Sequence, residues 1–259
     1  MSTASAAALP ELKFAGASID AREHIEPGTG SAKAFGVIAA VFVFLVLIVV
    51  TYGVALITLP IGLLADYFNR KKTMALLRGS SVEVGPQQLP ELHACGEEFA
   101  RRLGLREAPA IYIVEGNVIN AAATRIGSRQ VITLIDDVVD ACLRSGNPRA
   151  LGFVLAHEMA HHALGHTARW QTMLARSYKK LSRLNELSAD SVARALVGDP
   201  QIAALALLVL MTGPQLAPYV DRAAILRQAQ EVENDKVTIQ AERRLSHPLL
   251  LRRLQRVLR

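Results

Sequence analysis

A long uncharged run near the N-terminus constrains the fold more than any other feature. No charged residue occurs from Ala34 to Ala65. A helix needs about 20 apolar residues to span the hydrocarbon core of a bilayer, and this run is longer. A cleaved signal peptide is the alternative, but its apolar region is typically about 7–15 residues and lies at the very N-terminus. We therefore expect a retained transmembrane anchor over residues 34–65.

The basic residues that flank this run predict its orientation. Arg22 and Lys33 precede the run. Four basic residues follow it: Arg70, Lys71, Lys72 and Arg78. Because basic residues are enriched in cytoplasmic flanks, the sequence predicts a single-pass anchor in the inner cell membrane with a cytoplasmic C-terminal part. The periplasmic side is the alternative.

The remaining sequence divides around the anchor. Residues 1–33 are rich in Ala, Ser and Gly and are expected to form a flexible tail. Residues 66–84 read as a polar linker, and Gly85-Pro86 marks the entry to a domain over residues 85–259. The sequence thus predicts one medium-sized domain attached to a membrane anchor.

The net charge and the cysteines narrow the function classes. The formal charge is +6, but only 5% of the residues are aromatic and no nucleic-acid recognition motif is present, so no nucleic-acid partner is expected. Basic residues after the anchor and in the C-terminal tail favour contact with the anionic surface of the lipid bilayer. Cys95 and Cys142 could pair in an oxidising compartment, but a cytoplasmic domain favours two buried thiols.

The motif His-Glu-Met-Ala-His at residues 157–161 carries the chemistry. Residues four apart on a helix lie on one face about 5–6 Å apart, so His157 and His161 can hold one zinc ion. Glu158 points around the helix and can act as a general base on a water molecule. The flanking residues 151–156 are apolar, which places the motif on a buried helix where unpaired polar groups would be costly.

A catalytic zinc usually takes three ligands from the protein. His162 faces about 100° away from His161 and cannot share the site on a regular helix. The longer motif H-E-x-x-H-x-x-G-x-x-H would require Gly and His where the chain has Leu164 and Thr167, so His166 does not fit that pattern. A downstream acid remains, Glu186, with Asp190 one turn beyond it as a hydrogen-bond acceptor that orients a ligand histidine.

The periodicity predicts an α+β fold that is predominantly helical, with a small β-sheet. Strands are expected at residues 110–114, 118–124 and 130–134. Helices are expected from Pro90 to about residue 104, from 136 to 144, 148 to 164, 166 to 182, 184 to 197, 202 to 211 and 217 to 233, and from His247 onward.

Four motifs resemble those of one family and occur in the same order along the chain. They are Asn-Ala-Ala-Ala at residues 120–123, the run 157–166, Asn-Glu-Leu-Ser-Ala-Asp at 185–190, and Ser-His-Pro at 246–248 before Leu-Leu-Leu-Arg-Arg-Leu. The chain is similar over residues 85–259 to the membrane-associated gluzincin peptidases, which include the heat-shock protease HtpX and the CAAX prenyl proteases of the Ste type. Ala122 replaces the aromatic residue of that family's Asn-Ala-Phe-Ala segment.

The resemblance implies a zincin-like domain with one Zn²⁺ per chain and an exposed sheet edge. It implies roles for the following residues: His157, His161 and Glu186 as zinc ligands, Glu158 as catalytic base, His247 as catalytic oxyanion donor, Asp190 behind the ligands, and Asn120, Ala121 and Ala122 in substrate binding. It further implies polypeptide substrates, misfolded or membrane proteins, and work in protein quality control.

The chain departs from this family in its membrane segments. HtpX-type members carry further spans between the zinc helix and the third ligand, whereas 24 residues without membrane character separate His161 from Glu186 here. A single anchor argues against a buried intramembrane chamber. The prediction is a membrane-anchored zinc endopeptidase; the alternative is an inactive membrane-anchored zinc-binding scaffold, against which the retained Glu158 counts.

Overall fold

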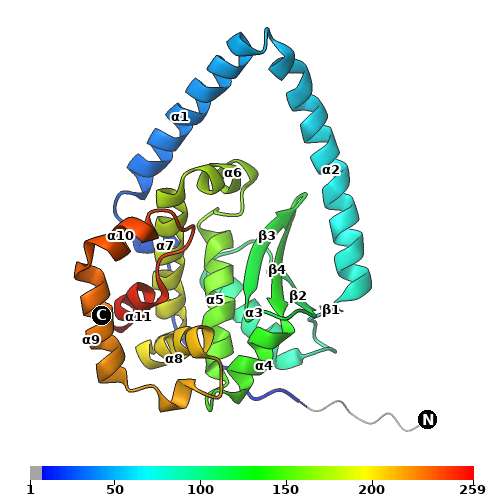
Figure 1. Cartoon of the computed structure of the whole chain (residues 1–259). Coiled ribbons are helices and arrows are strands. Elements are labelled where there is room, and N and C mark those ends of the chain that lie inside the picture. The colour runs from blue at the N-terminus through cyan, green and yellow to red at the C-terminus, as the bar shows by residue number, and fades with distance from the viewer. Residues whose placement is uncertain (1–7) are drawn as a thin grey trace.

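The computed structural model describes residues 8–259 and is mostly helical with one small mixed sheet (Figure 1). This confirms the predicted fold class at that level. The sheet has the strand order β1-β2-β4-β3. Its strands are β1 (Val82–Glu83), β2 (Ala110–Val114), β3 (Ala121–Ile126) and β4 (Arg129–Ile135).

The sheet leaves β3 at an open edge. β2 and β4 are parallel, while β1 and β3 join antiparallel on opposite sides. Because β3 pairs only with β4, its other side has backbone groups free to pair with another extended chain. The strand predicted over residues 118–124 is therefore present as β3, but it begins at Ala121 rather than at residue 118.

The central helix α5 (Arg149–Ala163) is buried along almost its whole length. It packs against β3 and β4 on one side and against α7 (Lys179–Val197) and α8 (Pro200–Thr212) on the other. The domain has these further helices: α3 (Pro90–Arg102), α4 (Asp136–Arg144), α6 (Arg169–Ser177), α9 (Arg222–Asn234), α10 (Lys236–Glu242) and α11 (Leu250–Leu258). The long polar helix expected over 166–182 is instead split at Tyr178 between α6 and α7.

The apolar run forms two helices that meet in a sharp turn (Figure 1). Helix α1 (Thr29–Val50) ends before Tyr52 and Gly53, which both have positive φ, 51° and 84°. Helix α2 (Val54–Ser80) then returns toward the domain. A single straight anchor over 34–65 is therefore wrong, because the left-handed residues reverse the chain inside the run.

The connection predicted over residues 66–84 is mostly helical. Helix α2 continues through it to Ser80, and β1 follows at Val82. This stretch is polar but rich in Lys, Arg, Leu, Met and Ala, which favour helix, so its polarity marks an exposed helix rather than a flexible connection.

The turn between α1 and α2 satisfies its own backbone donors. The N–H groups of Thr51, Tyr52 and Gly53 donate to carbonyls in the last turn of α1 at 2.9–3.2 Å. The N–H of Val54 donates to the carbonyl of Thr51 at 3.0 Å. Unpaired backbone groups are costly in lipid, so this bonding suits a turn that enters an apolar environment. We call α1, α2 and this turn the hairpin.

The segment before the hairpin packs on the domain, which overturns the expected flexible tail over residues 1–33 for its described part; residues 1–7 lie outside the described residues. Leu12 and Phe14 are buried in the main core. The Phe14 ring lies 5.2 Å from that of Phe99, and a Cβ at Gly152 would overlap it. The sparse apolar residues of this segment thus fill a groove that only the folded domain provides.

This packing is a geometric argument against the predicted single-pass topology. Leu12 and Phe14 precede the apolar run, yet they share one hydrophobic core with residues as late as Val257. Two parts of one core must lie on the same side of any membrane that the hairpin enters. A single pass with Phe14 and the domain on opposite sides would pull the core apart.

Replacing Phe14 tests whether this segment is part of the folded domain. We expect Phe14→Ala to lower the free energy of unfolding by about 3–5 kcal/mol, as for other buried Phe→Ala changes. Val118→Ala, at a 57% exposed side chain, is the matched control and should change it by less than about 0.5 kcal/mol. Urea unfolding of the full chain in mild detergent gives both values; equal effects would contradict the packing.

Candidate metal centre and catalytic site

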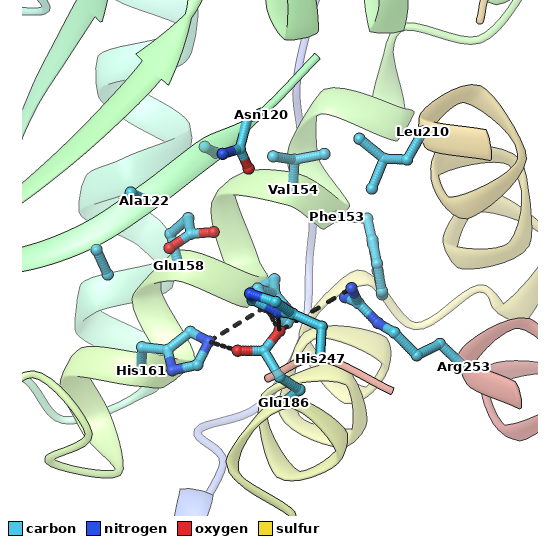
Figure 2. A pocket seen from close by; sticks show the side chains of 13 residues that line it. Asn120, Ala122, Phe153, Val154, Glu158, His161, Glu186, Leu210, His247 and Arg253 are labelled. Atoms are coloured by element: carbon cyan, nitrogen blue, oxygen red, sulfur yellow. Dashed lines mark hydrogen bonds and ion pairs between the residues drawn. The ribbon is translucent and has the colours of Figure 1, made fainter. Parts of the chain in front are cut away.

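Helix α5 carries His157 and His161, and α7 carries the carboxylate of Glu186 beside them (Figure 2). His157 Nε2 and His161 Nε2 are 3.2 Å apart. Glu186 places Oε2 3.5 Å from His157 Nε2 and Oε1 3.5 Å from His161 Nε2. These three residues are the one such group of potential metal ligands found within residues 8–259.

The spacing of the three ligand atoms fits a zinc ion. Tetrahedral ligands at about 2.0–2.1 Å from zinc lie roughly 3.3 Å from one another. The two histidine nitrogens are 3.2 Å apart, and each Glu186 oxygen lies 3.5 Å from one of them, which is close to the edge of such a tetrahedron. Two imidazoles and one carboxylate are a ligand set typical of catalytic zinc.

Local sequence fixes the position of this helix. Asn147 Oδ1 accepts from the backbone N–H of Arg149 at 3.1 Å and caps the start, with Pro148 before the first turn. At the other end Gly165 has φ of 72°, which reverses the chain after α5. The N–H of His166 then donates to the carbonyl of His161 at 2.9 Å, so His166 folds back onto the motif.

His157 is oriented from behind by Asp190. Its Nδ1 lies 2.9 Å from Asp190 Oδ1. Burial alone would raise the pKa of Asp190, but the charge and hydrogen bonds of Arg253 keep it below its ordinary value, so Asp190 accepts and His157 Nδ1 donates. Nε2 of His157 is thereby turned toward Glu186. The hydrogen bond expected between Asp190 and a histidine is thus present.

The protonation of His157 bears on metal uptake. Burial alone would lower its pKa, but hydrogen bonds to Asp190 and Glu186 outweigh burial and raise the pKa to about 10. A proton and a metal ion compete for the same lone pair on Nε2, so metal binding releases a proton. Burial lowers the pKa of His161 to about 4, so this second ligand is neutral.

Arg253 completes the site and was missed from the sequence. It forms a two-pronged ion pair with Asp190, with Nε to Oδ2 and Nη2 to Oδ1 both at 2.7 Å. Its Nη1 also lies 4.0 Å from Glu186 Oε2. The sequence offers only a weak signal for this role. Arg253 lies on the buried face of α11 with Leu254 and Val257, but its neighbour Arg252 is equally basic.

His166 and His162, whose roles the sequence left open, have separate positions. His166 Nδ1 lies 3.1 Å from His161 Nδ1. Burial lowers the pKa of His166 to about 2, so it is neutral and can accept from His161, which turns His161 Nε2 toward the ligand cluster. His162 points away, to Thr167 Oγ1 at 3.0 Å and the Val131 carbonyl at 3.2 Å, and joins α5 to β4.

Glu158 lies beside the ligand cluster on the side of the edge strand, and Figure 2 shows it between His161 and Ala122. The carboxyl is buried, and burial is the main cause that raises its pKa. The backbone N–H of Ala123 in β3 hydrogen-bonds it. A carboxylate held beside a metal centre with a raised pKa has the properties of a general base.

A cleft of about 340 Å³ joins these groups. The residues from Asn120 to Ala123 form one wall, and Phe153, Val154 and Leu210 contribute an apolar part. The carbonyl of Asn120 accepts from the N–H of Ile135 at 3.0 Å, which fixes the start of β3. The expected substrate-binding residues Asn120, Ala121 and Ala122 therefore border the same cleft as the metal cluster.

His247 lies on the loop before α11, at the mouth of this cleft. Its Nδ1 is 3.0 Å from Glu186 Oε2, and its side chain is 64% exposed. The hydrogen bond to Glu186 is the main cause that raises the pKa of His247. With Nδ1 donating to Glu186, Nε2 is the ring nitrogen left for a substrate.

The two cysteines take no part in the site. Cys95 and Cys142 are both buried free thiols. Burial raises the pKa of each to about 12, which makes them unreactive. They match the expectation of buried thiols rather than a disulfide.

Comparison with known proteins adds one observation. Residues 86–178 match the model of peptidase family M48. Peptidases of this family are zinc-dependent metallopeptidases, so the match supports hydrolase activity for a chain that carries the His157–His161–Glu186 cluster. The matched segment includes the edge strand and α5 but ends before Glu186. No curated protein and no solved structure matches the chain.

Removing the charge of Arg253 tests its part in the metal centre. We expect Arg253→Gln to weaken zinc binding by about 10–100-fold, because Asp190 loses the partner that keeps it aligned with His157. The neighbour Arg252, which pairs with Glu242 at 2.7 Å, gives the control Arg252→Gln. Zinc affinity is measured by competition with a coloured chelator.

The double variant Asp190→Asn/Arg253→Gln tests whether Arg253 acts through its ion pair with Asp190 or through the stability of the whole fold. Leaving one buried charge unpaired costs about 3–5 kcal/mol, whereas removing both partners costs less. We therefore expect the double variant to unfold at a higher urea concentration than Arg253→Gln alone. Additive destabilisation would contradict a direct pair.

Proposed function

We propose that this protein is a membrane-attached zinc endopeptidase that hydrolyses peptide bonds. The observation that carries the proposal is the cluster of His157, His161 and Glu186 with Glu158 beside it, in a cleft bordered by an open strand edge. The match of residues 86–178 to a peptidase family supports the same reaction class.

In this mechanism the residues of the chain divide the work. A zinc ion held by His157, His161 and Glu186 would polarise the scissile carbonyl and make water more acidic. Glu158 accepts a proton from the attacking water and returns it to the leaving amine. His247, at the mouth of the cleft, donates a hydrogen bond to the oxyanion of the tetrahedral intermediate.

The substrate is an extended polypeptide. The open side of β3 offers main-chain donors and acceptors, so a substrate can bind as an additional strand beside residues 121–126. Such binding selects an extended backbone more than a side-chain sequence. Unfolded or damaged proteins, including membrane proteins, are therefore the substrate class we propose, with quality control of the HtpX type as the biological role.

The hairpin attaches the enzyme to the bilayer. Its residues are largely exposed and apolar, and α1 is, by length and composition, the one helix within residues 8–259 able to cross a membrane. The uncharged part of α2, from Val54 to Ala65, is only about 18 Å long, less than the hydrocarbon thickness of about 30 Å. The exposed Tyr52 at the turn would then lie inside the bilayer rather than beyond it.

Both ends of the hairpin lie on one side in this proposal. Lys33 precedes the apolar run and Lys71 follows it, so in this topology the basic residues of both flanks lie on the same face of the membrane. Enrichment of basic residues on the cytoplasmic face then places the peptidase domain in the cytoplasm, at the inner cell membrane.

Replacing the general base tests the catalytic proposal. We expect Glu158→Gln in the full chain to lower casein cleavage by at least 10²–10⁴-fold while one zinc per chain stays bound, because the amide cannot take the proton. Glu98→Gln, at a half-buried glutamate of α3 that pairs with Arg101, is the matched control and should cleave normally. Cleavage is followed with fluorescent casein and zinc by elemental analysis.

Two results would decide against the peptidase. Bound zinc without cleavage in either the native chain or the Glu98→Gln variant would favour a zinc-binding scaffold. Absence of stoichiometric zinc from a folded native chain would remove the metal centre itself.

Cysteine labelling tests the same-side topology. Ser18→Cys and Ser128→Cys place exposed thiols before and after the hairpin, while native Cys95 and Cys142 are buried. In intact cells we expect a membrane-impermeant maleimide to treat both new thiols alike, and Tyr52→Cys to react only after detergent is added. Labelling of one flank but not the other would establish a single pass.

A further inference from the structure

A second cavity lies apart from the catalytic cleft. It has a volume of about 610 Å³ and is lined by residues of α1, α2, α6 and the far end of β3. Figure 1 shows α6 and this end of β3 below the turn of the hairpin. Its size falls in the range typical of sites for small molecules. It shares no residue with the cleft that contains Glu158.

The upper part of this cavity is apolar. Phe44 and Leu47 of α1 face it from one side, and Leu59 and Leu63 of α2 from the other. The two helices diverge from the turn toward the domain (Figure 1), and both contribute residues to the lining of the cavity. Within a bilayer such a space between apolar walls takes up hydrocarbon rather than water.

The floor of the cavity is basic. Four arginines line it: Arg70, Arg125, Arg169 and Arg176. Asp66 is the one acidic residue of the lining, so the net charge of the floor is +3. Arg70 and Arg169 hold Asp66 at 2.7 and 2.8 Å. Within residues 8–259, Arg125 and Arg176 form no ion pair, and Nε of Arg125 is buried without a hydrogen-bond partner.

Helix α6 presents exposed apolar side chains beside this floor. Its side chains Trp170 and Met173 are 54% and 58% exposed, next to Arg169 and Arg176. Tryptophan concentrates at the boundary between headgroups and hydrocarbon. A basic floor at that boundary, under an apolar chamber, has the polarity of a phospholipid molecule.

We propose that this cavity binds one anionic glycerophospholipid. Its acyl chains lie between α1 and α2, and its phosphate accepts charge-assisted hydrogen bonds from the arginines of the floor. The lipid is a structural ligand of the hairpin, and its binding does not depend on the peptidase activity proposed above.

Lipid binding to the purified full chain tests the headgroup contacts. Native mass spectrometry in detergent would titrate phosphatidylglycerol and phosphatidylcholine against the native chain and Arg169→Gln/Arg176→Gln. We expect one tightly bound phosphatidylglycerol, preferred at least tenfold over phosphatidylcholine. We expect the double variant to weaken its binding roughly thirtyfold, about fivefold for each arginine.

The matched control removes two arginines from exposed positions on other helices. Arg144→Gln/Arg227→Gln, on α4 and α9, carries the same loss of charge and should bind phosphatidylglycerol within twofold of the native chain. Equal weakening in both double variants would mean attraction by overall charge only. That result, or the absence of a preference for the anionic lipid, would overturn the site.

A second pair of variants tests the apolar part. A Cβ at Gly62 would meet no atom within 4 Å and Gly62 lines the cavity, so Gly62→Leu adds apolar volume to it. Gly79 on the same helix is equally open but lies outside the cavity, which makes Gly79→Leu the control. We expect only Gly62→Leu to weaken lipid binding, by at least tenfold. Unchanged binding in Gly62→Leu, or displacement of the lipid by inorganic phosphate, would overturn the chain-binding chamber.

Discussion

The ion pair between Asp190 and Arg253 is the contact on which the active centre depends. It is buried, and two charges leave water only when each finds a partner with good geometry. Asp190 lies on α7 and Arg253 on α11, while His157 on α5 bonds the same carboxylate. One buried carboxylate therefore holds three helices and sets the direction of the first histidine.

This arrangement makes the centre depend on the docking of α11. Arg253 lies on α11, whereas His157 and Glu186 belong to α5 and α7, which precede it in the chain. Before α11 docks, Asp190 lacks its positive partner and His157 lacks a fixed orientation. A metal centre of defined geometry thus belongs to the complete domain rather than to the zinc helix alone.

The local parts of this structure were readable from the sequence. Strand β2 and helix α4 begin and end at the predicted residues, because turn residues and periodicity mark them on both sides. The grouping of His157, His161 and Glu186 was also foreseen, since helical spacing fixes the first two and motif order points to the third.

The parts that escaped depend on contacts distant in sequence. Phe14 looks like an isolated aromatic in a polar tail, and only the groove at Gly152 makes it a core residue. Arg253 cannot be told from Arg252 without knowing which side of α11 is buried. The turn at Tyr52 lies within a run whose hydropathy is continuous, so composition alone gives no sign of a reversal.

Strand β3 physically connects the two cavities. Its first residues, from Ala121 to Ala123, border the catalytic cleft, and Thr124 and Arg125 border the cavity below the hairpin. One strand of six residues therefore contributes to the walls of both.

The docking of Phe14 on the domain gives the enzyme two attachments to its hairpin. One is the covalent connection through α2, and the other is the segment that enters α1 after packing against Phe99 and Gly152. A proteolytic cut in the loop between β1 and α3 would sever the first and leave the second in place. The clipped domain would stay bound to the hairpin as a two-chain complex, held also by the pairing of β1 with β2 and by α1 against α7.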